Sequence, residues 1–337
     1  MGLNRRVAVY GAYGHTGRFV VAELLSHGYV PVLCGRDGDK LAALAGSYPD
    51  LETRVAPIDD AKALDYALQG AMAVINCAGP FLDTAAPVIE AALRVGAHYL
   101  DTCAEQRAVQ EVMRRFSEPA KAAGLSVVPA LAFFGAVADL LATAAMDDWP
   151  DADEMEILVA LDSWHPTAGT RLTGARNHYR RVVVAGGELA PLADPPPTRQ
   201  WTFAAPFGTQ QMVALPLSEI IALHSHMRAS EVHSYMNLAP LADLRDPETP
   251  APAASDARGR SAQVFAVEVL VRRKGLVRRA MALGRDIYAI TAPLLVEGLR
   301  RIEAGEVGSG VLAPGAAFPA REFLESLPDL QLTVDAG

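Results

Sequence analysis

Cysteine is scarce in this 337-residue sequence, which contains three: Cys34, Cys77 and Cys103. They are too few and too widely spaced for a disulfide framework or for a Cys-x-x-Cys metal site. We therefore expect no metal centre and a reducing, cytoplasmic location. The beginning of the sequence also lacks the apolar segment of a secretory signal, because residues 1–6 lead directly into a strand-like run. Export is not expected.

Basic residues are outnumbered, and the apolar runs are interrupted. Thirty Lys and Arg against 39 Asp and Glu give a formal net charge of -9, which repels nucleic acid and anionic membrane surfaces. The most apolar stretch, 127–146, contains Pro129, Gly135 and Asp139, so it predicts a strand, a turn and a helix and no membrane span. Hydrophobic residues still make up 51% of the chain, enough for the two cores expected at this length.

Short β-branched runs alternate with amphipathic segments over the first 130 residues. Strands are predicted at 6–10, 30–34, 55–58, 73–77, 98–102 and 125–129. Helices are predicted at 16–27, 40–46, 61–69, 85–95 and 108–123. This alternation is typical of an α/β fold with a doubly wound parallel sheet of the Rossmann type, which we assign to residues 1–135.

Beyond residue 135 the rhythm changes to longer strand-like runs, at 155–161, 181–184 and 264–272. They predict a second α+β domain over 136–287, built on a mostly antiparallel sheet and used for substrate binding or dimerisation. Residues 239–260 are rich in Pro, Ala and Asp and predict an exposed loop. Helical spacing returns after residue 288, and we expect the C-terminal helices of 288–337 to pack back on the first domain.

A glycine-rich loop lies directly between the first predicted strand and the first predicted helix. Its glycines permit a tight turn, a close approach of the main chain to a pyrophosphate, and packing of the helix on the strand. The alternative is a glycine-rich turn without a ligand. The cofactor-binding residues expected here are Gly11, Tyr13, Gly14, His15, Thr16 and Gly17.

A basic residue stands at the end of the second strand, where an NAD-specific site places an acidic one. Arg36 can pair with the 2′-phosphate of NADP(H), and Lys40 adds a second positive charge. The alternative is that Arg36 is solvated and that Asp37 or Asp39 reaches the ribose of NAD. The sequence favours NADP(H).

Small residues follow the fourth strand, where the carboxyl edge of a doubly wound sheet borders the dinucleotide. They allow the main chain to approach the cofactor, although a simple turn at the Gly-Pro pair explains them equally well. The residues are Asn76, Cys77, Ala78, Gly79, Pro80 and Phe81.

Polar groups gather after the fifth strand, beside the expected position of the nicotinamide. Asp101, Cys103 or Glu105 can supply the proton of a reduction if burial moves its pKa toward neutrality. The alternative is that Asp101 caps the next segment and that Cys103 is an inert buried thiol.

A polar loop, 162–171, follows a strand of the second domain and contains His165, a residue type that titrates near neutral pH. Thr170 and Arg171 are candidate substrate-binding residues, and the arginine implies an acidic substrate. A lone histidine in a loop is more often a hydrogen-bonding surface residue than a catalyst, and the alternative for Arg171 is that it only holds a local carboxylate. The histidines near residues 224–233 lack the accompanying carboxylates or cysteines of a metal site.

Several segments together resemble the saccharopine dehydrogenase-like reductases, which include the trans-acting enoyl reductases. The resemblance rests on 11–17, 76–81, 99–105, 259–261, 284–292 and 310–315 in their order along nearly the whole chain. It implies a Rossmann domain, a second α/β domain inserted before the C-terminal helices, and NADP-dependent reduction of a C=C or C=N bond. The chain is short for a saccharopine reductase, whose larger second domain binds a dicarboxylic amino acid.

The sequence thus predicts an NADPH-dependent reductase of a small molecule, either acidic or derived from a lipid or polyketide. Two alternatives remain open: an NADP-binding sensor of the NmrA type without turnover, and an NAD-linked amino-acid dehydrogenase. The long strands of the second domain are candidates for pairing across a homodimer.

Overall fold

The computed structural model describes residues 5–335 and divides the chain into two compact units. The first unit consists of Met1–Ala132 with Thr291–Leu312, and the second of Phe133–Ile290 with Ala313–Gly337. Each unit has its own sheet, so the chain crosses between the two units three times.

The first unit is built on a parallel sheet of seven strands in the order β15-β6-β5-β4-β1-β2-β3. Its central strands are almost entirely buried, as the continuous apolar runs of the sequence predict. The order reverses between β1 and β4, which is the switch point where such sheets bind ligands. The strands are β1 (Arg6–Tyr10), β2 (Val30–Gly35), β3 (Thr53–Val55), β4 (Ala73–Asn76), β5 (His98–Asp101), β6 (Ser126–Val128) and β15 (Gly310–Val311).

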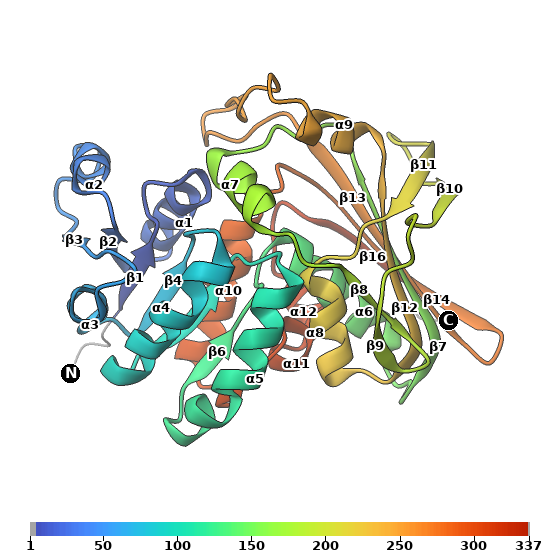
Figure 1. Cartoon of the computed structure of the whole chain (residues 1–337), viewed down its shortest axis with the longest axis horizontal. Helices are drawn as coiled ribbons and strands as arrows, with labels where there is room; N and C mark the ends of the chain where they lie inside the picture. Colours follow the sequence, from blue (N-terminus) through green and yellow to red (C-terminus); the bar gives the residue numbers. More distant parts are fainter. Residues whose placement is uncertain (1–4, 336–337) are drawn as a thin grey trace. The chain divides into compact units, whose positions relative to one another are not determined.

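Helices cover both faces of this sheet, as right-handed crossovers require when the strand order reverses. Figure 1 shows α4 and α5 on one side of the sheet and α10 on the other, where it packs against α1. The predicted doubly wound Rossmann fold is therefore confirmed. The helices are α1 (His15–Ser26), α2 (Gly38–Ala45), α3 (Ala61–Leu68), α4 (Phe81–Val95), α5 (Gln106–Ala122) and α10 (Thr291–Glu303).

The C-terminal end of α10 is fixed to the opening strands of the chain. Arg5 donates to both carboxylate oxygens of Glu303 over 3.2 Å, and the Tyr29 hydroxyl donates to the same carboxylate over 2.7 Å. The guanidinium of Arg5 also lies 4.2 Å from the centre of the Tyr29 ring. A helix some 290 residues away in the sequence thereby becomes part of the first unit.

The second unit is built on a nine-stranded sheet, in which β10-β11-β12-β7-β13-β14-β16 form one path and β8 and β9 extend from β12. All of its strand pairs are antiparallel except β12 with β7. The predicted, mostly antiparallel second sheet is confirmed. Its strands are β7 (Ala152–Leu161), β8 (Val182–Ala185), β9 (Glu188–Pro191), β10 (Thr198–Thr202), β11 (Thr209–Ala214), β12 (Ala229–Asn237), β13 (Val264–Arg273), β14 (Leu276–Arg285) and β16 (Gln331–Asp335).

Helices of the second unit pack on one another and on this sheet, with α6 in contact with β13, α8 and α12. Helix α7 differs because none of its side chains is buried. The elements are η1 (Phe133–Val137), α6 (Ala138–Met146), α7 (Ala168–Arg176), α8 (Ser218–His226), α9 (Ala239–Arg245), α11 (Pro314–Ala317) and α12 (Ala320–Glu325). No helix in residues 5–335 has both the length and the apolar character needed to cross a membrane.

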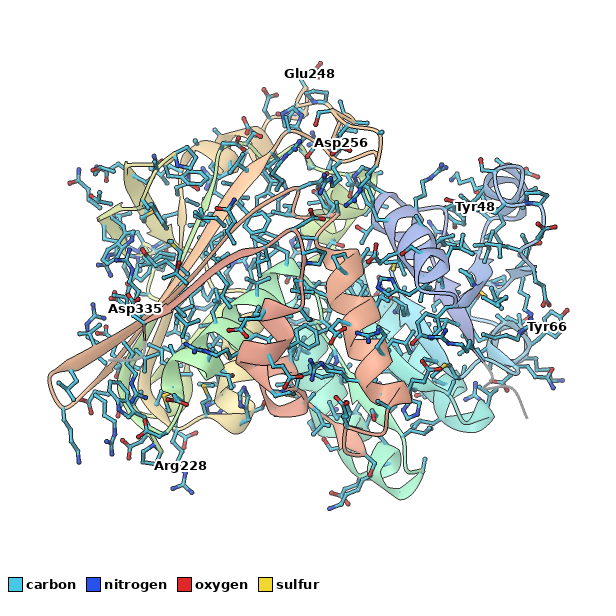
Figure 2. The ribbon with its side chains drawn as sticks, turned by 180° about the vertical axis from the view of Figure 1, so that it is seen from behind. Tyr48, Tyr66, Arg228, Glu248, Asp256 and Asp335 are labelled. Carbon is cyan, nitrogen blue, oxygen red and sulfur yellow. The ribbon has the colours of Figure 1, made fainter. Side chains whose placement is uncertain are left out.

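Two segments differ from the sequence-based expectation. Of the returning segment 288–337, only 291–312 joins the first unit, because α12 packs on α6 and β16 pairs with β14 in the second unit. The expected loop at 239–260 begins with α9, whose Pro240 and Leu241 are buried. The rest of it is largely exposed, and Figure 2 labels Glu248 and Asp256 there.

Candidate functional site

The glycine loop of the first unit forms a closely packed turn at the end of β1. The main-chain N–H groups of Gly11 and Ala12 both donate to the carbonyl of Cys34, the last residue but one of the neighbouring strand β2. Gly11 has φ +85°, and a Cβ on Gly17 would lie 2.3 Å from the Gly11 carbonyl oxygen. The first and third glycines are therefore required by the backbone itself, as their position in the sequence predicts.

The N-terminus of α1 is left available to an anion, whereas its neighbours are capped by side chains. Gly14 occupies the N-cap of α1 and has no side chain to accept from the first N–H groups. The carboxylates of Asp37 and Asp60 make such bonds at α2 and α3. Helix N-termini carry partial positive charge and N–H donors, so this end of α1 fits the diphosphate of a dinucleotide.

The edge after β2 carries the positive charge expected of an NADP site. Arg36 is exposed directly after the strand, and its guanidinium has no ion-pair partner within the part of the chain that the structure describes. Asp37 is committed to α2: its carboxylate accepts from the Lys40 N–H and lies 3.0 Å from the Lys40 ammonium. The charges at this edge therefore favour a 2′-phosphate over a ribose hydroxyl.

Tyr13 lies between the glycine loop and this edge. A Cβ on Gly35 would come within 2.6 Å of the Tyr13 ring, so the ring lies against the main chain at the end of β2. The Lys40 ammonium is 5.8 Å from the ring centre. Of the other loop residues, His15 packs edge-on against Phe19 with ring centres 5.3 Å apart, and Thr16 follows it in the first turn of α1.

The loop after β4 is held by a buried amide. Asn76 is fully buried, donates to the hydroxyls of Thr84 and Tyr99, and accepts from the Ala78 N–H over 3.0 Å. A Cβ on Gly11 would lie 3.0 Å from Ala78, so the first and fourth strands end in contact. The sequence-predicted residues of this loop other than Asn76 are half-buried or begin α4: Cys77, Ala78, Gly79, Pro80 and Phe81.

The three candidate proton donors after β5 are all buried, and each is engaged by its neighbours. Asp101 accepts from the Tyr99 hydroxyl and from the N–H groups of Cys103 and Ala130, at 2.7–2.9 Å. Burial raises the pKa of Asp101 to about 6. Burial also raises the pKa of the Cys103 thiol well above its usual value, so this thiol stays protonated at neutral pH.

Glu105 caps a helix other than its own. Its carboxyl accepts from the main-chain N–H groups of Phe81 and Leu82, at 2.7 and 3.4 Å, in the first turn of α4. Burial raises its pKa, and these two hydrogen bonds partly oppose that rise. Asp101 and Glu105 thus order the loops that border the expected cofactor.

In the second unit, the sequence-predicted polar loop is ordered around Tyr288. Its hydroxyl lies 3.0 Å from that of Thr170 and accepts from the indole N–H of Trp164 over 3.1 Å. Burial raises the pKa of Tyr288. The ring of the half-buried His165 has no hydrogen-bond or ion-pair partner among the described residues.

Arg171 holds a loop in place and pairs with no carboxylate within residues 5–335. Its guanidinium donates to the main-chain carbonyls of Asp246 and Thr249, at 3.2 and 2.8 Å. These contacts join α7 to the segment that follows α9. An anionic group of a substrate would have to share this guanidinium with the two carbonyls.

A small cavity lies inside the second unit, between the sheet and the segments η1 and α8. Its volume is about 10 Å³, enough for one water-sized group. Most of the lining side chains are apolar, and the polar ones are Glu219, Ser234 and Tyr235. Phe134 in the wall stacks on Trp164 with ring centres 5.2 Å apart, so the cavity adjoins the loop ordered by Tyr288.

Sequence reasoning did not single out Glu219 or Tyr288. Glu219 stands in the apolar run 213–223, where a lone acidic residue is itself a signal of a buried carboxyl group. Tyr288 lies within the segment 284–292 on which the family resemblance partly rests. Its pairing with Thr170 spans 118 residues and becomes visible only in the folded chain.

Within residues 5–335, no three His, Cys, Asp or Glu side chains are arranged to hold a metal ion. The three cysteines form no disulfide among these residues.

Comparisons with known proteins agree with this geometry. Residues 7–128 match the family described as the saccharopine dehydrogenase NADP binding domain. The chain is 29% identical over 152 residues to the human saccharopine dehydrogenase-like oxidoreductase, covering 40% of this chain and 35% of that protein. It is 30% identical over 146 residues to the lipid droplet localized protein of Caenorhabditis elegans, covering 40% and 34%. The chain thus spans about a third of the length of these curated relatives.

Among solved structures, the apo saccharopine dehydrogenase (L-Glu forming) of Saccharomyces cerevisiae has the same fold over both units. The TM-score is 0.66 at 13% identity, and the alignment covers 98% of this chain and 100% of the yeast chain. The resemblance predicted from the sequence is confirmed, and so is the prediction of NADP(H) as the cofactor.

Proposed function

We propose that this chain, whose residues 7–128 are an NADP-binding domain of the saccharopine dehydrogenase type, is an NADPH-dependent reductase of a small molecule. The bond reduced is a C=C or a C=N bond. When bound, NADPH supplies a hydride from C4 of its nicotinamide ring. The residues of the first unit bind and orient the cofactor, and those of the second unit bind the substrate.

The observation that carries this proposal is the arrangement at the carboxyl ends of β1 and β2. Gly14 has no side chain to cap α1, so the N-terminus of this helix can face a diphosphate, and the guanidinium of Arg36 at the edge of the sheet has no ion-pair partner among residues 5–335. Asp37, the acidic alternative, is already bonded to Lys40. This combination favours NADP(H) over NAD(H).

The second unit supports an apolar substrate better than a dicarboxylic one. Arg171 and Arg181 donate to main-chain carbonyls, so an acidic substrate would have to share their guanidinium groups. A dicarboxylic substrate needs guanidinium groups that face it in pairs. A lipid-derived or polyketide-derived substrate has no such requirement.

For the proton, we propose His165 ahead of the three buried candidates of the first unit. The carboxyl oxygens of Asp101 and Glu105 accept from main-chain N–H groups, and the raised pKa of Cys103 makes its thiol too weak an acid to release its proton near neutral pH. The imidazole of His165 has no such commitment among the described residues. His165→Gln should lower kcat at least about tenfold with an unchanged Kd for NADPH.

Fluorescence titration with NADPH and NADH tests the cofactor site. Arg36→Glu should raise the Kd for NADPH by about tenfold or more and leave that for NADH nearly unchanged, because only NADPH carries the 2′-phosphate. Arg114→Glu, which changes an exposed arginine on α5, serves as the matched control and should leave both values unchanged. An equal loss for the two cofactors in Arg36→Glu would contradict the assigned role.

Turnover separates an enzyme from a sensor. Stoichiometric consumption of NADPH with a panel of conjugated enones, enoyl thioesters and imines is the expected result. Tight NADPH binding without consumption across the panel would favour the sensor of the NmrA type. A preference for NAD⁺ with amino acids would favour the dehydrogenase.

We also propose a cytoplasmic location and a homodimer formed through the second unit. The cysteines form no disulfide among the described residues, which suits a reducing compartment. Strands β10 and β16 end the sheet path of the second unit and carry main-chain groups that a second copy can pair with. Sedimentation of the purified chain tests the dimer.

A further inference from the structure

The side chain of Tyr13 leaves the glycine loop and lies against the end of β2. The three atoms nearest to a Cβ built on Gly35 all belong to the Tyr13 ring, at 2.6, 3.3 and 3.4 Å. Gly35 does not have a positive φ, so its backbone conformation does not itself require glycine. The ring is what excludes a side chain there. Contact with the main chain of Gly35 therefore holds the ring at the edge of the sheet that carries Arg36.

Two tyrosine hydroxyls lie near the end of β1, and they differ in what they bind. Tyr10 is buried, and its hydroxyl donates to the main-chain carbonyl of Ala56 over 2.9 Å. Tyr13 is half-buried, and its hydroxyl makes no hydrogen bond to any residue of 5–335. A phenol hydroxyl is a donor and an acceptor. The hydroxyl of Tyr13 is therefore available to a ligand, whereas that of Tyr10 is part of the fold.

Positive charges stand beside the Tyr13 ring. The guanidinium of Arg36 directly follows β2 and has no ion-pair partner in the described part of the chain. The ammonium of Lys40 lies 5.8 Å from the ring centre, within reach of a cation–π attraction, and 3.0 Å from the carboxylate of Asp37. Burial raises the pKa of Tyr10 to about 12, and the charge of Arg36 opposes that rise, so the guanidinium is close to both tyrosines. A ligand group at this edge is thus an anion.

We propose that Tyr13 determines cofactor specificity, because its hydroxyl donates a hydrogen bond to the 2′-phosphate of NADP(H) beside Arg36. Packing of the ring on Gly35 orders the hydroxyl before the cofactor binds, which lowers the entropic cost of binding. NADH presents a neutral ribose hydroxyl instead, and a hydrogen bond to a phosphate is stronger than one to a neutral group. The inference rests on the 2′-phosphate site of the proposed function, and it is independent of the bond that the chain reduces.

Removal of the hydroxyl alone tests this role in the full chain. Tyr13→Phe keeps the ring that packs on Gly35, and fluorescence titration without substrate measures the binding of both cofactors. The Kd for NADPH should rise about tenfold, and that for NADH should change less than about twofold. Tyr66→Phe, at a tyrosine of α3 that is 58% exposed, is the matched control and should leave both values unchanged. An unchanged Kd for NADPH in Tyr13→Phe, or an equal loss for the two cofactors, would overturn the proposal.

A second arm tests whether Gly35 acts through the ring. Gly35→Ala should displace the ring and raise the Kd for NADPH about tenfold, since the hydroxyl moves with it. In a Tyr13→Ala chain the same substitution should cost nothing further, because the three atoms that the new Cβ would meet first are gone. An equal loss from Gly35→Ala in the two chains would show that Gly35 acts independently of Tyr13, which contradicts the positioning of the hydroxyl by the ring.

Two fragments of the cofactor separate failure of this inference from failure of the proposed function. Adenosine 2′,5′-bisphosphate and adenosine 5′-monophosphate differ only in the 2′-phosphate, and calorimetric titration should show that the original chain binds the first at least about tenfold more tightly. In Tyr13→Phe this ratio should fall, with the monophosphate bound as before. A ratio that is the same in both chains overturns the role of Tyr13 and leaves the site at Arg36 intact. Equal binding of the two fragments by the original chain overturns both.

Discussion

The carboxyl group of Glu105 accepts a hydrogen bond from the main-chain N–H of Phe81 over 2.7 Å, which places an acidic side chain at the N-terminus of α4. Two helices, α1 and α4, begin at the switch point of the first sheet, and each presents a positive end there. At α4, the carboxyl group of Glu105 accepts from the N-terminal N–H groups of the helix. At α1 the N-cap is Gly14, which has no side chain. The diphosphate of the cofactor is therefore directed to α1.

Removing the Glu105 carboxyl should destabilise the first unit. Glu105→Ala leaves buried N–H groups at Phe81 and Leu82 without an acceptor, which costs about 1–3 kcal/mol of unfolding free energy. Urea denaturation measures this loss. Glu105→Gln keeps a carbonyl acceptor and should lose less than half as much. Glu118→Ala, at an exposed position of α5, should change nothing, and an equal loss there would contradict the capping role.

Adding one methyl group to the glycine loop should abolish tight cofactor binding. In Gly17→Ala the new Cβ would lie 2.3 Å from the Gly11 carbonyl oxygen and 2.9 Å from that of Ala12, so the loop or α1 must move. We expect the Kd for NADPH to rise at least about tenfold, because the N–H groups no longer meet the diphosphate. Fluorescence titration measures the change.

Gly174→Ala is the matched control for that substitution. Gly174 lies in α7, where an added Cβ meets nothing within 4 Å, and alanine favours a helix by about 0.5–1 kcal/mol over glycine. NADPH binding should be unchanged. Were Gly17→Ala to bind NADPH as well as Gly174→Ala does, the loop would not be the diphosphate site.

The cofactor half of the molecule was predictable because its signals are local. The central strands of the first sheet are short apolar runs, and the loop or charge that follows each of them in the sequence also follows it in space. Arg36 needs no distant partner to be placed at the edge of the sheet. Residues 11–17 are similarly positioned by the strand before them and the helix after them.

The second unit depends on long-range pairing that the sequence does not display. Tyr288 orders a loop more than 100 residues away, and β16 was expected with the first unit because its partner β14 is known only from the folded chain. Glu219 is hidden in an apolar run that by itself predicts only a buried element. The substrate side was therefore predicted only in outline, and the hydrogen bonds of Arg171 to two main-chain carbonyls are a further contact that the sequence does not display.

His226 is paired with a buried carboxylate: its Nε2 lies 2.7 Å from Oδ1 of the fully buried Asp139. The other oxygen of Asp139 accepts from the Gly315 N–H over 2.7 Å, so this carboxylate joins α6, α8 and α11. Burial lowers the pKa of His226, but the charge and the hydrogen bond of Asp139 outweigh it and raise the pKa above 6.5. The protonated histidine is thus bound more strongly in the folded chain than in the unfolded one.

A raised histidine pKa stabilises the fold fully below pH 6.5 and loses that contribution as the pH rises through the folded value. Glu219 adds a loss of stability of the same sign, because its folded pKa of about 7 lies above the 4.5 of an ordinary glutamate.

Comparison of the original chain with His226→Gln separates the contribution of His226 from that of Glu219. The variant should lose about 1–3 kcal/mol of unfolding free energy at pH 6 and less at pH 8.5, so its stability curve is flatter. Urea denaturation at both pH values measures the difference, and His178→Gln, at an exposed histidine, should follow the original chain. A constant offset between His226→Gln and the original chain at both pH values would mean that His226 is neutral in the fold and that its contact with Asp139 is an uncharged hydrogen bond.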